Sequence, residues 1–315
     1  MLVTPFTQLI GCQMPIQQAP IAGAAGPALV EAVCRAGALG MLPMTGLTPL
    51  ADAVARVAGS GCGPFGVNFL LPLVPAMEKD AIVEHAAASA RLVEFFYDDP
   101  DADLVSRAHS LGALTGWQVG SPDEARAAAD AGCDLVVAQG IEAGGHVRGQ
   151  MPLLVLLDAV CDAVAVPVVA AGGIAGPRST AAALAAGAAA VRVGTRFVAS
   201  AESDAHPDYI AAVLAAGHGE TVLTTAFGAE WPDAPHRVLR SALAAAQTAA
   251  PVVGASPDGG QVVRFSTSPP SRGTTGNIAA MALYAGEGVG AIRAVEPAAK
   301  IVAHLALGAE QLLHR

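Results

Sequence analysis

One unit recurs along the first two hundred residues and sharply limits the folds open to this chain. Gly37, Gly132 and Gly187 stand where a helix typically ends in a left-handed residue. Each glycine separates an Ala-rich segment from an apolar run: CRAGALGML (34–42), DAGCDLVVA (130–138) and AAGAAAVRVG (185–194). Because the apolar residues of each run are continuous instead of alternating, each run indicates a strand buried on both faces. The repetition predicts helices that alternate with the strands of a parallel sheet.

Eight strands of this kind are predicted. They cover residues 16–21, 39–42, 65–70, 92–96, 114–119, 135–139, 166–170 and 190–194. The clearest helix start between them has Ser121 as N-cap, Pro122 at the first helical position and Glu124 as the capping-box partner. Eight strand–helix units favour a closed (β/α)8 TIM barrel over an open Rossmann sheet, and a length of 315 residues suits one barrel with an insertion.

The regular pattern stops after the eighth predicted strand. Residues 201–290 are rich in Pro, Gly and Thr, with 230–247 (EWPDAPHRVLRSALAAAQ) predicted as one helical piece and 268–277 (SPPSRGTTGN) as a loop. An amphipathic segment at 297–313 is expected to return as the last barrel helix. We therefore expect a barrel made of residues 1–200 and 291–315, and a small, mainly helical insertion at 201–290 that caps the active site.

Composition excludes several classes of protein. Hydrophobic residues make up 53% of the chain and charged residues 14%, so a large core forms and disorder is excluded. The net charge is −10 and no basic patch is visible, so a nucleic-acid partner is not expected. The mean hydropathy of +0.49 comes largely from alanine. The most apolar stretch, 152–174, contains Asp158 and Asp162, so no membrane span is expected.

The cysteines and the N-terminus bear on where the protein works. Five cysteines are scattered without a CxxC pair, which fits free thiols in a reducing cytoplasm and predicts neither a disulfide framework nor a metal site. The first residues, MLVTPFTQL, lack a basic region followed by an apolar one, so no signal peptide is expected. A cytoplasmic location is the expectation.

The segment 166–197 carries the strongest local signal. The seventh predicted strand ends in Gly172 and Gly173, and the eighth ends in Gly194 and Thr195. In a TIM barrel the loops after strands seven and eight are the usual place for a phosphate group. Glycines let backbone N–H groups approach the phosphate, and a threonine hydroxyl adds a donor. The segment therefore predicts a phosphate-binding site.

Polar side chains at other strand ends extend this candidate site. Gln139, Glu142 and His146 share a glycine-rich loop after the sixth strand, where His146 is flanked by small residues that leave room for a ligand. A histidine acts as a base or as a hydrogen-bond donor near neutral pH. Asn68 and Gln118 come at the ends of the third and fifth strands and are able to hydrogen-bond a polar ring edge.

Several of these segments together resemble one known family, over nearly the whole chain. The motifs are PIQQAPIAG (15–23), GVNF (66–69), VAQGIEAGGH (137–146), AAGGI (170–174), RVGTRF (192–197) and EWPDAPHRVLR (230–240). They are similar in order and spacing to motifs of the nitronate monooxygenases, formerly called 2-nitropropane dioxygenases. Flavin-dependent enoyl-ACP reductases share much of the same pattern.

The resemblance implies an FMN-containing TIM barrel that oxidises alkyl nitronates or nitroalkanes with O2 to carbonyl compounds and nitrite. His146 matches the family's catalytic base, which removes the α-proton of a neutral nitroalkane or hydrogen-bonds the nitro group of a nitronate. The architecture is compatible with a homodimer. The residues expected to bind the cofactor are Ala22, Gly23, Asn68, Gln118, Gln139, Gly144, Gly145, Gly172, Gly173, Arg192, Val193, Gly194 and Thr195.

One departure from the family motif leaves the substrate open. The best-studied class has Gly-Gly-His-Arg-Gly, whereas Val147 follows His146 here. An NAD(P)H-dependent flavin reductase acting on an enoyl thioester or a quinone is the main alternative, although the chain has no GxGxxG dinucleotide motif. An inosine-monophosphate-dehydrogenase type of barrel needs a nucleophilic cysteine after strand six, and none of the five cysteines lies there. A flavin-storing or ligand-binding protein without turnover is the third alternative.

Overall fold

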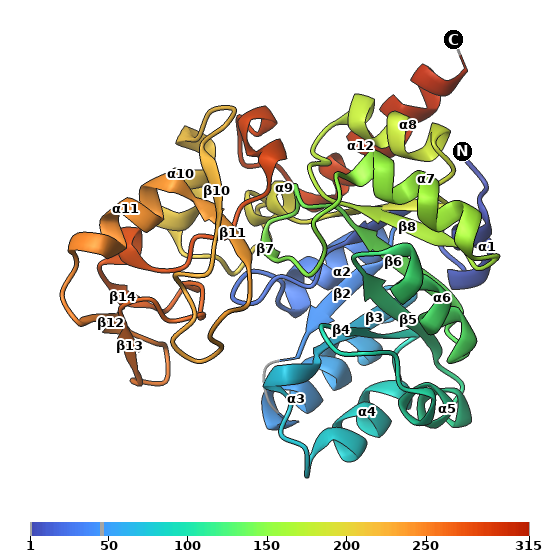
Figure 1. Ribbon diagram of the computed structural model, residues 1–315, viewed down its shortest axis with the longest axis horizontal. Helices are drawn as coiled ribbons and strands as arrows, with labels where there is room; N and C mark the ends of the chain where they lie inside the picture. The colour runs from blue at the N-terminus through green and yellow to red at the C-terminus, as the bar shows by residue number, and fades with distance from the viewer. Residues whose placement is uncertain (1, 45–46, 315) are drawn as a thin grey trace.

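Eight parallel strands form a barrel at the centre of the computed structural model, which describes residues 2–44 and 47–314 (Figure 1). The order of neighbours is β1-β9-β8-β6-β5-β4-β3-β2. Their bounds are β1 (Ile16–Gln18), β2 (Gly40–Pro43), β3 (Phe65–Leu70), β4 (Leu92–Phe96), β5 (Leu114–Val119), β6 (Leu135–Gln139), β8 (Val168–Ala171) and β9 (Ala190–Val193). The predicted TIM barrel is confirmed, and each predicted strand overlaps an observed one.

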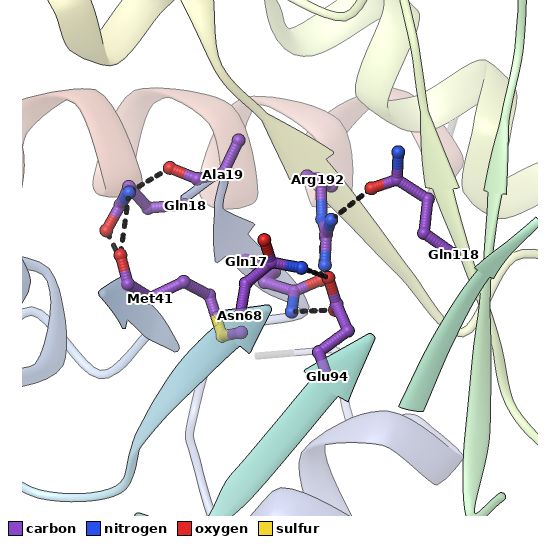
Figure 2. Close-up of polar contacts among 8 residues, drawn as sticks. All are labelled: Gln17, Gln18, Ala19, Met41, Asn68, Glu94, Gln118 and Arg192. Atoms are coloured by element: carbon purple, nitrogen blue, oxygen red, sulfur yellow. Dashed lines mark hydrogen bonds and ion pairs between the residues drawn. The ribbon is translucent and has the colours of Figure 1, made fainter. Parts of the chain in front are cut away.

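The barrel closes between β1 and β2. The backbone N–H of Gln18 donates to the carbonyl of Leu39 at 2.9 Å, and the N–H of Leu39 donates to the carbonyl of Ile16 at 3.0 Å. The side chain of Gln18 adds to this seam, since its Oε1 accepts from the N–H of Met41 at 3.0 Å and its Nε2 donates to the Met41 carbonyl at 3.3 Å (Figure 2). A buried amide thus satisfies backbone groups where the ladder is short.

Helices surround the barrel, and most of them connect one barrel strand to the next. Gly37, Gly132 and Gly187 have φ values of +82°, +97° and +102°, which confirms the predicted left-handed helix ends. The helices are α1 (Pro5–Ile10), α2 (Pro27–Arg35), α3 (Leu47–Gly59), α4 (Lys79–Ala87), α5 (Ala102–Ser110), α6 (Pro122–Asp130), α7 (Leu153–Ala163), α8 (Pro177–Ala185), α9 (Thr195–Val198) and α12 (Ala298–Leu313), with the 3-10 turn η1 (Leu71–Leu73).

The start of α6 is confirmed, but one detail of its capping is wrong. Ser121 is the N-cap, and its side chain accepts from the N–H of Glu124 at 3.2 Å. The Glu124 carboxylate instead accepts from the N–H of Gly120 at 2.7 Å, one residue before the N-cap. Its second oxygen binds Nε of Arg148 at 2.6 Å, so the tertiary contact with Arg148 replaces the second half of the capping box.

Residues 201–290 form a lobe beside the barrel (Figure 1). It has two small antiparallel sheets, one of which takes in β7 (Gly145–His146) from the loop after β6. Its elements are α10 (Pro207–Ala215), β10 (Thr221–Thr224), β11 (His236–Leu239), α11 (Arg240–Thr248), β12 (Val252–Ala255), β13 (Gln261–Val263), β14 (Thr275–Gly276), η2 (Ile278–Ala280) and η3 (Glu287–Ala291). The insertion was expected to be mainly helical, but it also contains the strands β10 to β14.

One prediction inside the lobe is wrong. The segment 230–247 is not one helical piece, because its helix begins only at Arg240. Pro232 and Pro235 supply no backbone N–H, and the residues that follow pair with β10 and β7 as strand β11. The segment 268–277 is a loop apart from β14, as expected. The division of the chain into domains at 201–290 stays a prediction.

The return to the barrel at the C-terminus is confirmed. Helix α12 begins after the N-cap Pro297 and packs against α8 and α2 on the barrel (Figure 1). The lobe has an apolar cluster of its own, in which Phe227, Val238 and Met281 are buried. Within residues 2–44 and 47–314, no helix is long and apolar enough to cross a membrane.

Candidate active site

A cavity lies at the C-terminal ends of the barrel strands. It collects twelve of the predicted site residues: Ala22, Asn68, Gln118, Gln139, Gly144, Gly145, His146, Gly172, Gly173, Arg192, Gly194 and Thr195. Three predicted residues, all described by the structure, lie outside the lining: Val193, Gly23 and Glu142, whose carboxylate accepts from the N–H of Leu153 at 3.0 Å. Val193 is fully buried in the barrel core, and Gly23 makes a turn at φ +72° against Pro269. Val193 is the last residue of β9 and Gly23 lies in the loop after β1, and neither lines the cavity.

Glycines bring bare backbone together on one side of the cavity. Gly172 and Gly173, after β8, have φ values of +128° and +65°, which only glycine adopts readily. A Cβ at Gly144 would lie 2.5 Å from the backbone nitrogen of Gly286, so these two loops touch backbone to backbone. The hydroxyl of Thr195 accepts from the N–H of Gly286 at 2.9 Å, which leaves its own proton available for a ligand. This wall fits the predicted phosphate site.

A buried network of polar side chains includes Asn68, Gln118 and Arg192 of the cavity lining (Figure 2). Its centre is Glu94 on β4, which is 0% exposed and forms an ion pair with Arg192 on β9. Asn68 Nδ2 donates to Glu94 Oε1 at 2.9 Å, and Gln17 Nε2 donates to Glu94 Oε2 at 3.2 Å. Arg192 also donates to Gln118 Oε1 at 2.6 Å and to Gln17 Oε1 at 3.2 Å. These contacts satisfy the buried charges, whose desolvation is otherwise costly.

Aromatic rings surround His146 on β7. Its ring stacks on Trp231 with centroids 4.4 Å apart and planes at 24°. The ring centroids of Tyr97 and Tyr284 lie 6.3 Å and 5.7 Å from that of His146. The pairing of β7 with β11 sets His146 opposite His236, with ring centroids 5.2 Å apart. Barrel and lobe therefore share this site, because Trp231, His236 and Tyr284 all come from the lobe.

Both histidines are held in the neutral form. Burial, and secondarily the charge of His236, lower the pKa of His146 to about 3. Burial also lowers the pKa of His236, against a hydrogen bond to Ala234 that raises it. The N–H of Phe227 donates to His236 Nε2 at 3.1 Å, so Nδ1 is the protonated nitrogen and donates to the Ala234 carbonyl at 2.9 Å. An uncharged imidazole therefore faces the cavity at neutral pH.

The lowered pKa of His146 makes the folded protein sensitive to acid. The unfolded chain binds the proton near pH 6.5, whereas the folded protein binds it only near pH 3. Between these values the unfolded state holds more protons, so the free energy of unfolding falls as the pH falls. We expect His146 to contribute a loss of about 3 kcal/mol from pH 7 to pH 4. In urea unfolding, the free energy of unfolding of His146→Gln should therefore fall by about 3 kcal/mol less between pH 7 and pH 4 than that of the unsubstituted protein.

A control separates this effect from general acid denaturation. His85 on α4 is exposed, and its substitution in His85→Gln leaves the aromatic site intact. The loss between pH 7 and pH 4 should be the same in His85→Gln as in the unsubstituted protein. An equal loss in His146→Gln would show that the imidazole of His146 does not resist protonation.

Two buried polar atoms at the cavity have no protein partner. Among the described residues, Oε1 of Gln139 and Nε2 of His146 accept or donate no hydrogen bond, although Gln139 Nε2 donates to the His146 carbonyl at 2.9 Å. An unpaired buried polar atom costs about 1–3 kcal/mol, so both atoms are set for a ligand that completes them. The cavity is lined by Gly172, Gly173 and Thr195 and by the polar side chains of Asn68, Gln118 and Arg192. This lining suits a flat, polar, phosphate-bearing cofactor. Within the described chain, no group of three His, Cys, Asp or Glu side chains is placed to bind a metal ion.

Sequence reasoning missed several residues of this site. Glu94 and Gln17 were not among the candidates, although Glu94 interrupts the apolar run LVEFF, and a lone charge in a buried strand is a usable signal. Trp231, His236 and Tyr284 were missed as well. Trp231 and His236 lie within the family motif at 230–240, but that motif assigned them no role beside His146, and Tyr284 lies outside every quoted motif.

Comparison with known proteins places the chain among flavin enzymes. A family model described as nitronate monooxygenase matches residues 4–308. A nitronate monooxygenase from Pseudomonas aeruginosa is 33% identical over 290 residues, covering 76% of this chain and 82% of the relative. A (3aS,4S,5R,7aS)-5-hydroxy-7a-methyl-1-oxo-octahydro-1H-indene-4-carboxyl-CoA dehydrogenase from Mycobacterium tuberculosis is 38% identical over 247 residues, covering 77% and 67%. The solved structure of FabK from Thermotoga maritima matches with a TM-score of 0.81 and 29% identity, covering 100% of this chain and 98% of the other.

Proposed function

Because the chain belongs to the nitronate monooxygenase family, whose members are flavin-dependent oxidoreductases, we propose that it uses FMN to oxidise alkyl nitronates with O2 to carbonyl compounds and nitrite. When bound, FMN would supply the redox chemistry that links oxidation of the substrate to reduction of oxygen. The protein binds and orients both molecules. A cytoplasmic location and a homodimer stay predictions.

Two groups of residues that line the cavity support FMN as the cofactor. Gly172, Gly173 and Thr195 offer backbone and hydroxyl donors to the phosphate group. Asn68 and Arg192 also line the cavity and offer polar groups to the flavin ring. FMN carries its ring and its phosphate at opposite ends of one molecule. A single FMN molecule can therefore contact both groups of residues.

The buried Nε2 of His146, which has no hydrogen-bond partner among the described residues, is the observation that carries the choice of substrate. A base with a pKa of about 3 is too weak to remove the α-proton of a nitroalkane near neutral pH. A nitronate has already lost that proton and carries its negative charge on the nitro oxygens. The uncharged imidazole of His146 has an N–H to donate to such an oxygen, beside the rings of Trp231 and Tyr284. The hydrogen-bonding role therefore suits His146 better than the base role.

An anaerobic titration tests this function. The FMN-loaded protein is mixed with the nitronate of a small alkane, then separately with the parent nitroalkane, without any nicotinamide. We expect the nitronate to remove the visible band of oxidised flavin far faster than the nitroalkane, and oxygen then to restore it with release of nitrite. His146→Asn should slow the reaction with nitronate by about 10–100-fold, the loss expected for one hydrogen bond to a charged group. A flavin band that nitronate leaves unchanged contradicts the proposal.

A second candidate function is favoured by the similarity to the M. tuberculosis CoA dehydrogenase, which at 38% identity exceeds that to the P. aeruginosa nitronate monooxygenase. In this alternative the same flavin site exchanges electrons between an acyl-CoA thioester and a further redox partner such as NAD(P)H. The anaerobic titration decides between the two. A flavin band that NADH, NADPH or a CoA thioester removes, and that nitronate does not, would assign the protein to this second class.

A further inference from the structure

The network around Glu94 has two kinds of members. Asn68, Gln118 and Arg192 line the cavity, whereas Glu94 and Gln17 are fully buried behind them. Glu94 therefore reaches a ligand only through the residues that it holds. Its two carboxylate oxygens accept from three different strands, since Asn68 lies on β3, Arg192 on β9 and Gln17 on β1. A carboxylate placed in this way sets the orientation of its neighbours.

The first consequence concerns the amide of Asn68. Because Nδ2 of Asn68 donates to Glu94 Oε1 at 2.9 Å, the amide oxygen of Asn68 is the atom left to face a ligand, as an acceptor. Gln118 has the opposite orientation. Its Oε1 accepts from Arg192 at 2.6 Å, so its amide nitrogen is left as a donor. This part of the lining, called the floor below and made of Asn68, Gln118 and Arg192, thus presents the Asn68 oxygen as an acceptor and the Gln118 nitrogen as a donor.

The second consequence concerns charge. Arg192 lines the cavity, but its positive charge is paired with the negative charge of Glu94. In a site of low dielectric constant an unpaired arginine would strongly favour negative charge on a bound ligand. The ion pair removes most of that effect. The floor is therefore polar and nearly uncharged.

We propose that Glu94 is a positioning residue for the cofactor: it turns the Asn68 oxygen toward the flavin ring and cancels the charge of Arg192 beneath it. The imide edge of a flavin has one N–H beside carbonyl oxygens, which the Asn68 acceptor and the Gln118 donor complement. The uncharged floor keeps negative charge on the reduced flavin unfavourable, and so keeps the reduction potential of the bound flavin low. This inference rests on the proposed FMN site, but not on the choice of substrate.

The substitution Glu94→Gln tests both consequences at once. It keeps the size of the side chain but adds an NH2 group and leaves Arg192 unpaired. We expect Asn68 to turn its oxygen to the new NH2 group, so that dissociation constants for FMN and for riboflavin both rise about tenfold, the value of one hydrogen bond. Riboflavin has the same ring without the phosphate and isolates the effect on the ring. The midpoint potential should become more positive, by about 30 mV for a tenfold change in a two-electron equilibrium.

Two further variants make the outcome decisive. Glu94→Asp keeps the charge and shortens the reach, so flavin binding should weaken while the midpoint potential stays near that of the unsubstituted protein. Glu296→Gln removes a carboxylate from the Arg196–Glu296 ion pair, which lies outside the cavity, and should change neither quantity. Fluorescence quenching gives the dissociation constants, and redox titration with a dye gives the potentials.

The possible results separate the inference from the proposed function. Weaker binding of both flavins and a raised potential in Glu94→Gln, with Glu296→Gln unchanged, support the positioning role. Unchanged binding and potential in Glu94→Gln overturn it while FMN remains the cofactor. If Glu94→Gln does not fold, flavin binding by Glu94→Asp within twofold of the unsubstituted protein overturns it. An unsubstituted protein that binds neither flavin overturns the proposed function as well.

Discussion

Replacing Arg192 with methionine is expected to lower the free energy of unfolding by about 3–5 kcal/mol, because it leaves the carboxylate of Glu94 buried without its counter-ion. Glu94 is 0% exposed, so water does not replace the lost partner. Oxygen atoms of Gln17 and Gln118 lose a donor at the same time. Urea unfolding at pH 7 measures the loss. A decrease below about 1 kcal/mol would mean that the ion pair is not buried as the structure describes it.

The double variant Arg192→Met with Glu94→Gln is the matched control. It removes both charges and keeps the side chains close to their original volumes. Replacing both partners of a buried ion pair by uncharged groups costs little, whereas removing one partner is strongly destabilising. We therefore expect the double variant to recover more than half of the stability lost by Arg192→Met. Without such a recovery, the loss would reflect packing at Arg192 and not the charge of Glu94.

A single methyl group at Gly144 is expected to abolish most of the binding of FMN. The Cβ in Gly144→Ala would lie 2.5 Å from the backbone nitrogen of Gly286 and 2.7 Å from the carbonyl carbon of Ala285. Backbone atoms cannot turn aside as a flexible side chain does, so the loop at 285–288 must move away from the cavity. That movement breaks the hydrogen bond from Gly286 to Thr195. We expect the affinity for FMN to fall at least about 100-fold, which corresponds to about 3 kcal/mol.

Gly176→Ala is the control for this prediction. Gly176 is the N-cap of α8, close along the chain to Gly172 and Gly173, and its backbone is extended at φ −152°. A Cβ there meets no described atom within 4 Å. Equilibrium dialysis with FMN should therefore give the same affinity for Gly176→Ala as for the unsubstituted protein. Unchanged affinity in Gly144→Ala would show that the two loops do not have to touch to hold the cofactor.

The barrel could be predicted from sequence because each of its units carries its own local signal. Gly132, for example, ends α6 at φ +97°, and the run after it becomes strand β6. Such signals work because the left-handed conformation and the continuous apolar run are set by neighbours in the chain. In the lobe, the prediction of one helical piece at 230–247 was wrong. There β11 forms by pairing with β7, which is about ninety residues earlier in the sequence, so local helix propensity did not decide the structure.

The site likewise has residues that could be predicted from sequence and residues that could not. The glycines after β8 and β9 and the polar residues at strand ends were predicted, because in a parallel barrel all strand ends face one side. The setting of His146 was not. Its expected role as a base follows from the ordinary pKa of histidine, whereas burial among Trp231, Tyr284 and His236 lowers that pKa to about 3. Each of these three neighbours belongs to a segment that the sequence places far away.

The amino-acid sequence by itself determined the barrel, the glycines that line the cavity and the family, because these depend on short segments whose residues act on one another locally. Only the tertiary structure decided how the polar groups are paired and charged. Glu94 and Arg192 stand 98 residues apart, and their ion pair exists because β4 and β9 send side chains into the same barrel interior. Protonation and hydrogen-bond direction depend on distance in space and on exclusion of water, which the order of residues does not specify.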